Sequence, residues 1–308
     1  MLDSQAGKPS GMANVKVNKD QLMGYYSSVA GIMLKHLAGH PLILKPIGSE
    51  ALVELADVAE LVDNSEASEP GASTTPPPVI SITHPNRESI HHVLCNKPDQ
   101  LPYLAEQGTV SFYRCTSTVA DIQSPRYLIF DLNPAADDFR PVRLAAFRLR
   151  RQLESLSLEP FVMTTGRNGL HVVTPIRPDH SYDAARSLAS AIARLITERY
   201  PEELTTEQRT ERRHGRTYIN VLHNAFGQIA VAPYSVRDLP AGPVATPITW
   251  QELEESIYSS RQFNIGNVAH LLNQRPDPWL EIEADAANLD EVERLLRAQI
   301  EDQRPPSS

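Results

Sequence analysis

The sequence predicts a mixed α/β (α+β) protein in which antiparallel or mixed sheets are flanked by helices. Three observations support this prediction. Long amphipathic stretches alternate with short runs of β-branched and aromatic residues, several of these runs are joined by tight turns, and 41% of the 308 residues are hydrophobic. Paired runs joined by turns favour hairpins over a doubly wound parallel sheet.

Helices are expected where apolar residues recur every three to four positions and so share one helix face. Residues 19–37 show this spacing from Leu22 to Leu37, and residues 182–200 repeat it with Ser181 available as an N-cap. The predicted helices are residues 19–37, 98–107, 142–156 and 182–200, with later helical stretches at Leu253 and at 268–272.

Strands are expected at short runs that are rich in β-branched and aromatic residues. The clearest run is 127–132, which stops at Asn133-Pro134. The predicted strands are residues 41–45, 79–83, 110–115, 127–132, 161–165, 170–176, 216–221 and 229–232. Residues 166–169 form a tight turn between two of them.

The length of the chain allows two domains, or one large domain of two lobes over residues 18–300, between loose tails at 1–17 and 301–308. A segment near 64–78 that is rich in Pro, Ser and Thr is expected to be a loop. No apolar run approaches the ~20 residues that span a bilayer, and residues 1–11 lack the apolar stretch of a signal peptide. We therefore expect a soluble, cytoplasmic monomer that does not contact membranes.

Charge and cysteine content argue against two classes of protein. The formal net charge of −9 argues against a generic nucleic-acid coat. Cys95 and Cys115 lack C-x-x-C spacing, so we expect reduced, packed thiols and no zinc site. Arginines nevertheless gather in two clusters, which are either solvated helix faces or a phosphate-facing stripe: Arg140, Arg143, Arg148, Arg150 and Arg151, then Arg209, Arg212, Arg213 and Arg216.

The end of the predicted strand 127–132 carries a possible metal site. Asp131 and Asn133 are two residues apart, so their side chains point to the same face of the strand. Two carboxylates placed in this way can share a pair of divalent ions for phosphoryl or nucleotidyl transfer. Here the second position is an amide, which can ligate a metal but carries no charge.

The turn between strands 161–165 and 170–176 could hold phosphate. Its two glycines, Gly166 and Gly169, allow close backbone approach. Thr165 adds a hydroxyl, Arg167 a guanidinium and His171 an imidazole. Backbone N–H groups and a cation in such a turn can bind phosphate oxygens, although a plain β-turn explains the same pattern. Further on, Arg216 and Arg237 could clamp a triphosphate or form surface ion pairs.

Taken in order, these segments resemble the polymerase domain of bacterial ligase D, a member of the primase-polymerase superfamily. That family shows D-x-D, S-G-x-K-G-x-H, G-R-V-x-I-D and A-P-Y-S-x-R. This chain shows DLN, TGRNGLH, GRTYIN and APYSVR in the same order and at matching spacing. Tyr25-Tyr26, the run Gly39-His40-Pro41-Leu42 and Asp277-Pro278-Trp279 resemble further landmarks of the family.

The resemblance implies a two-lobed primase-polymerase fold with the active site in a cleft between the lobes. It implies nucleotide addition at DNA ends during non-homologous end joining, with nucleoside triphosphates, DNA ends and repair proteins as partners. Three aspartates would hold Mn²⁺ or Mg²⁺. The positions that match nucleotide or phosphate contacts are Lys45, Thr165, Gly166, Gly169, His171, Arg216 and Arg237, with Arg167 in place of the turn lysine and Lys19 matching a contact to a DNA 5′-phosphate.

The chain departs from the family at the metal ligands. Asp131 matches the first aspartate, but Asn133 and Asn220 replace the other two. Asn is a poor ligand for ions that favour carboxylates, so metal binding is expected to be weak and centred on Asp131. We therefore expect a protein that holds nucleotide but is impaired in nucleotidyl transfer. An active polymerase in which Asp137 or Asp138 supplies the missing carboxylate, and a protein-binding scaffold, remain as alternatives.

Overall fold

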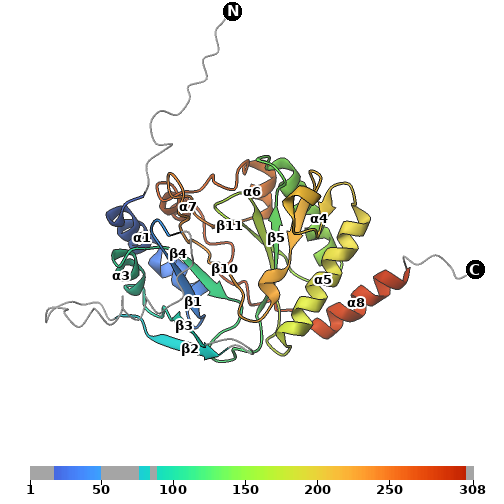
Figure 1. Cartoon of the computed structure of the whole chain (residues 1–308), viewed down its shortest axis with the longest axis horizontal. Helices are drawn as coiled ribbons and strands as arrows, with labels where there is room; N and C mark the ends of the chain where they lie inside the picture. The colour runs from blue at the N-terminus through green and yellow to red at the C-terminus, as the bar shows by residue number, and fades with distance from the viewer. Residues whose placement is uncertain (1–16, 50–75, 84–88, 303–308) are drawn as a thin grey trace, which may run out of the picture.

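The helices and strands of the computed structural model, which describes residues 17–49, 76–83 and 89–302, are arranged around two sheets (Figure 1). Most of the predicted tails and most of the predicted loop near 64–78 therefore lie outside the described residues. Within these ranges, no helix has both the length and the apolar character that crossing a membrane requires. The mixed α/β class and the two-lobed arrangement predicted from the sequence are confirmed.

The first sheet is antiparallel and has the strand order β10-β4-β1-β3-β2. Its strands are β1 (Leu42–Pro46), β2 (Val79–Thr83), β3 (Ser89–Val93), β4 (Thr109–Cys115) and β10 (Ile229–Val231). Helix α1 (Lys19–Leu37) packs on it beside α3 (Gln100–Glu106). Tyr26 of α1 anchors this packing, because its ring meets Phe112 edge-on and its hydroxyl donates to the Val110 carbonyl at 2.7 Å.

The second sheet has the strand order β11-β6-β7-β5-β9-β8 and is antiparallel except for the β8–β9 pair. Its strands are β5 (Tyr127–Asn133), β6 (Phe161–Thr164), β7 (Leu170–Pro175), β8 (Leu204–Thr205), β9 (Thr217–Asn220) and β11 (Thr246–Ile248). The helices on this side are α4 (Arg140–Glu154), α5 (Tyr182–Arg199), α6 (Trp250–Glu255) and α8 (Leu289–Asp302), whereas α7 (Val268–Gln274) lies beside α1 (Figure 1). Strand β5 lies inside the sheet, so its end can gather side chains from both neighbouring strands.

The segment from β10 to β11 passes from the first sheet to the second and is fixed to the first lobe. The Tyr25 hydroxyl donates to the Tyr234 carbonyl at 2.8 Å, and the Val236 N–H donates to the Tyr26 hydroxyl at 3.0 Å. The Ser111 hydroxyl donates to the Val236 carbonyl at 2.6 Å. These buried hydrogen bonds set the position of the next residue, Arg237.

Each predicted helix and strand is present, with differences of a few residues at the ends. The sequence did not predict β3, β8, β11 or α8. Strand β3 has a polar sequence, SIHHV, that shows little apolar alternation, and β11 contains Pro247, which weakens a strand signal. Cys95 and Cys115 are free and buried, as predicted, and burial raises the pKa of each thiol to about 12.

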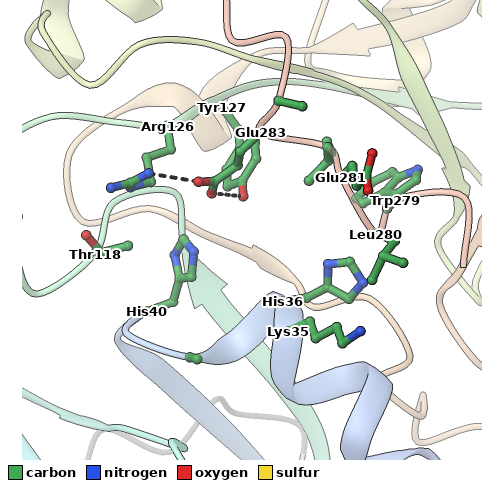
Figure 2. A pocket seen from close by; sticks show the side chains of 13 residues that line it. Lys35, His36, His40, Thr118, Arg126, Tyr127, Trp279, Leu280, Glu281 and Glu283 are labelled. Atoms are coloured by element: carbon green, nitrogen blue, oxygen red, sulfur yellow. Dashed lines mark hydrogen bonds and ion pairs between the residues drawn. The ribbon is translucent and has the colours of Figure 1, made fainter.

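A polar pocket of about 490 Å³ lies at the Tyr127 end of β5, away from Asp131 (Figure 2). Glu283 closes one side by accepting from Arg126 at 2.8 Å and from the Tyr127 hydroxyl at 2.5 Å. His40 forms part of the wall, and its Nδ1 lies 3.0 Å from the Cys115 carbonyl and 2.9 Å from the Ser117 carbonyl. Asp131 is not among the residues that line this pocket, so the pocket is distinct from the possible metal site at Asp131.

Acid is expected to destabilise the fold through His40. Burial, with nearby Arg114, lowers the pKa of His40 to about 3, well below its value near 6.5 in an unfolded chain. Between pH 6.5 and 3 the His40 side chain is therefore protonated in the unfolded state but not in the folded state. The free energy of unfolding falls as the pH falls through this window. The loss from this one residue between pH 7 and pH 4 is on the order of 3 kcal/mol.

Urea unfolding of His40→Asn at pH 7 and pH 4 checks this expectation, with His270→Asn, on the exposed surface, as the matched control. The native protein and His270→Asn should lose the same stability on acidification, and His40→Asn should lose clearly less. Equal losses in all three proteins would show that His40 is not responsible.

Candidate functional site

The end of β5 brings three side chains together across neighbouring strands. Asp131 is directly opposite His171 of β7 on one side and Asn220 of β9 on the other. Side chains at directly opposed positions share a face of the sheet and lie close together. His223 joins them from the 3-10 helix η3 (Leu222–Asn224), which follows β9 immediately.

The Asp131 carboxylate is held between two imidazoles. Its Oδ1 lies 3.6 Å from His171 Nε2, and its Oδ2 lies 3.5 Å from His223 Nε2. Burial alone would raise the pKa of Asp131, but the interactions with His223 and His171 together outweigh it and hold this pKa well below the usual range. Burial lowers the pKa of His171 to about 4, whereas the bond to Asp131 overcomes burial at His223 and raises its pKa. At neutral pH the site therefore contains a carboxylate and a neutral His171.

Asn220 turns its amide nitrogen toward Asp131. Its Oδ1 accepts the Leu222 N–H at 3.0 Å and the Tyr218 hydroxyl at 3.3 Å. These two donors identify which end of the amide is the oxygen, so its Nδ2 donates to Asp131 Oδ2 at 3.2 Å. A group that donates a hydrogen bond in this direction cannot also ligate a cation there.

The predicted pair of divalent ions does not fit this set of side chains. Asn133 Nδ2 donates to the main-chain carbonyl of Asp131 at 3.3 Å, so one carboxylate remains where two ions would need several. Asp138 is bound by Arg140 at 2.9 Å, and with Asp137 it lines a separate small hollow beside Arg167. Over the described ranges, the one group of side chains arranged to hold a metal is Asp131, His171 and His223.

The turn at 165–169 is closed by its own side chain and backbone. The Thr165 hydroxyl lies 3.2 Å from the Gly169 N–H and 3.1 Å from the Gly169 carbonyl. Gly166 has φ of +66°, and a Cβ there would lie 2.7 Å from Arg237 Cγ. The turn therefore packs directly against the aliphatic part of Arg237.

Three predicted phosphate contacts lie at or near this turn and on β1. The Arg237 side chain is buried, and its guanidinium carbon lies 5.3 Å from the centre of the Tyr113 ring. Burial lowers the pKa of Arg237, with Arg167 acting in the same direction and Asp131 in the opposite one. Lys45 is mostly buried and lies 3.7 Å from Asp238, the residue after Arg237. Arg167 is exposed on the turn.

Two further predicted residues are not brought to Asp131. Arg216 precedes β9, at the opposite end from Asn220, and its guanidinium donates to the backbone carbonyls of Arg213, Arg212 and Pro201. Lys19 is exposed at the first turn of α1, where its Cε lies near Gly108. Their roles in binding phosphate stay predictions.

The first arginine cluster behaves as a solvated face. Arg140 pairs with Asp138, Arg148 with Glu203 at 2.7 Å, and Arg150 with Glu154 at 2.6 Å. Pairing within the chain leaves little of this cluster free to contact a phosphate backbone. This favours a solvated helix face over a phosphate-facing stripe.

His223 was not predicted as a site residue from the sequence. It lies three residues after Asn220, in the short 3-10 helix that follows the end of β9. The run Asn220-Val221-Leu222-His223 was therefore the available signal, but using it required knowing that β9 ends at Asn220 and that a helical turn follows.

Comparisons with known proteins agree on one family. The model of the LigD primase-polymerase domain family matches residues 18–279. The LigD end-joining protein of Bacillus subtilis is 29% identical over 195 residues, which cover 63% of this chain and 32% of that protein. The multifunctional LigD of Pseudomonas aeruginosa is 24% identical over 277 residues, covering 87% and 31% respectively. The chain thus matches about a third of the length of these relatives.

A solved structure supports the same architecture. The polymerase domain of Mycobacterium tuberculosis ligase D, determined in complex with DNA, superimposes with a TM-score of 0.73 at 21% identity. The match covers 92% of this chain and all of that one. The two sheets and the surrounding helices are therefore the fold of a ligase D polymerase domain.

Proposed function

Because the chain belongs to the LigD primase-polymerase domain family, we propose that it binds a nucleoside triphosphate at DNA ends in end joining but is impaired in nucleotidyl transfer. Its relatives in Bacillus subtilis and Pseudomonas aeruginosa are non-homologous end joining proteins, and a structural neighbour was solved with DNA. Asn133 and Asn220, which stand beside Asp131 in place of two aspartates, support the proposed impairment of nucleotidyl transfer.

The Arg237 guanidinium carries the nucleotide-binding part of this proposal. The Arg237 side chain is 8% exposed and its guanidinium lies over the Tyr113 ring, but no carboxylate in the described parts of the chain lies within 4.0 Å of it. A buried charge without a partner is unfavourable, so a bound anion would stabilise it. A triphosphate oxygen is a suitable partner, since a guanidinium can bind phosphate through two parallel hydrogen bonds.

Neighbouring groups support a phosphate rather than a carboxylate ligand. Gly166 packs against the stem of Arg237, and Arg167 extends from the same turn as an exposed second cation. Lys45 lies beside Asp238, the residue that follows Arg237 in the chain. Two cations at one turn, Arg237 and Arg167, suit an anion that carries several negative charges. A pure scaffold would not need a buried, unpaired guanidinium, so this alternative is disfavoured.

Nucleoside triphosphate binding is expected in a buffer with excess chelator, because the phosphate contacts come from side chains and not from metal. Arg237→Met removes the charge but keeps an apolar stem against Gly166. Losing a charge-assisted hydrogen bond should weaken binding by about 10- to 100-fold. Isothermal titration calorimetry on the folded proteins measures this change.

The matched control is Arg194→Met, which makes the same substitution on the exposed face of α5. It should bind nucleotide as the native protein does. Failure of the native protein to bind at millimolar nucleotide, or equal affinity in Arg237→Met, would overturn the nucleotide-binding proposal.

A further inference from the structure

The geometry points to a mononuclear transition-metal site formed by Asp131, His171 and His223, which takes one ion such as Zn²⁺ in place of a carboxylate-bound ion pair. The potential ligand atoms are one carboxylate oxygen and two imidazole nitrogens. All of them lie within 4.8 Å of one another. This inference does not depend on nucleotide binding, because its ligands are all protein side chains.

The spacing of the ligand atoms suits a single ion. Bonds of about 2.0–2.1 Å in tetrahedral geometry place neighbouring ligand atoms about 3.3 Å apart. The distances from His171 Nε2 and His223 Nε2 to the nearer Asp131 oxygens are 3.6 and 3.5 Å. These two distances are within a few tenths of an ångström of the ideal spacing. The two imidazole nitrogens, each of which faces a different carboxylate oxygen, lie within 4.8 Å of one another and would have to approach by up to about 1.5 Å to share one ion.

The second nitrogen of His223 is already placed as in a metal ligand. Its Nδ1 lies 2.8 Å from the Ile229 carbonyl, to which it donates, and its Nε2 faces Asp131. A metal-bound histidine commonly donates its other N–H to a backbone carbonyl, which fixes the tautomer and the ring orientation. The same contact ties the site to β10, which begins at Ile229.

Asn220 acts as a supporting group in this arrangement. Its Nδ2 donates to Asp131 Oδ2 at 3.2 Å and orients the carboxylate. A carboxylate in its place would be a further metal ligand, whereas the amide nitrogen can only orient the Asp131 carboxylate. The change from a carboxylate to an amide at this position thus suits a site with imidazole ligands.

The ligand types determine the class of metal. Imidazole favours Zn²⁺, Fe²⁺, Ni²⁺ and Cu²⁺, whereas Mg²⁺ favours oxygen ligands in octahedral geometry. Two histidines and one carboxylate leave at least one coordination position for water or substrate. The absence of C-x-x-C spacing, which argued against zinc in the sequence, concerns cysteine ligands and does not bear on this site.

Calorimetric titration of the chelator-stripped protein with Zn²⁺, and separately with Mg²⁺, tests the inference without nucleotide. We expect one Zn²⁺ per chain, bound at least about 100-fold more tightly than Mg²⁺. His223→Asn should lower the Zn²⁺ affinity by at least about 100-fold, since it removes a ligand. Co²⁺ bound in place of Zn²⁺ should give a visible d–d absorption that His223→Asn abolishes.

The matched control is His214→Asn, which makes the same substitution at an exposed histidine outside the site, where φ of +49° suits asparagine. It should bind Zn²⁺ as the native protein does. Asp131→Asn, which keeps the side-chain shape, guards against a folding defect in His223→Asn and should also lose binding. Equal Zn²⁺ affinity in the native protein, His223→Asn and Asp131→Asn would overturn the inference, as would equal affinity for Mg²⁺. Nucleotide binding measured under chelator remains a separate result, so either proposal can fail alone.

Discussion

Asn133→Asp combined with Asn220→Asp is expected to create manganese-dependent primer extension in a chain that otherwise shows little. Both positions flank Asp131, one along β5 and one across the strand pair with β9. Converting both to aspartate raises the number of carboxylates at the end of β5 from one to three. Two divalent ions then gain the negatively charged oxygen ligands that they prefer.

The effect on metal binding should be large because it depends on charge. The amide of Asn220 now donates to Asp131 Oδ2, so the change to aspartate replaces a hydrogen-bond donor by a ligand. Metal affinity depends on the number of charged ligands, and two added carboxylates should tighten Mn²⁺ binding by at least about 100-fold. Calorimetry with Mn²⁺ measures the change in metal affinity. Extension of a primer on gapped DNA with a 5′-phosphate measures nucleotidyl transfer.

The matched control adds the same charge elsewhere. Asn96→Asp combined with Asn288→Asp introduces two carboxylates, and both side chains accept backbone N–H bonds that aspartate can also accept. This pair should leave Mn²⁺ binding and extension unchanged. Native activity close to that of the restored protein would mean that other carboxylates already serve the ions, and the proposed impairment would be wrong. Tight Mn²⁺ binding without extension would place the remaining defect in the binding of template or primer.

The strands that carry the site could be predicted because their signals are local. Strand β5 has an uninterrupted apolar run, and the turn at 165–169 is marked by two glycines. The pairing of Asp131 with Asn220 was accessible only through a family resemblance, because the two residues are 89 positions apart. Register across distant strands depends on tertiary packing, which a local pattern does not contain.

Other features of the site depend on details that no residue pattern specifies. The direction of the Asn220 amide is determined by Leu222 N–H and the Tyr218 hydroxyl. The Arg216 guanidinium binds backbone carbonyls, one of them that of Pro201, which precedes the two-residue strand β8, and β8 has no recognisable sequence signal. The burial of Arg237 without a carboxylate partner likewise appears only when the lobes are assembled.

Gly169→Ala is expected to destabilise the fold and distort the site together. A Cβ at this position would lie 2.1 Å from the Leu132 carbonyl oxygen, a distance that real Cβ atoms do not show. The obstructing atom belongs to the backbone of β5, so no side-chain rotation can relieve the clash. Separating β7 from β5 should cost about 3 kcal/mol of unfolding free energy.

Gly31→Ala provides a control that should change the free energy of unfolding in the opposite direction. Gly31 lies on the exposed face of α1 with nothing within 4 Å of an added Cβ, so alanine there should stabilise the protein by about 0.5–1 kcal/mol. Urea unfolding measures both changes. Equal stability of the two variants would show that β5 and β7 are not as close as described.

Gly169→Ala also tests the link between this contact and the metal site, because Leu132 lies between Asp131 and Asn133. A loss of stability in Gly169→Ala that spares Zn²⁺ binding would show that the metal ligands tolerate a shift of β5. A parallel loss of both would show that this glycine holds the strand on which the site depends.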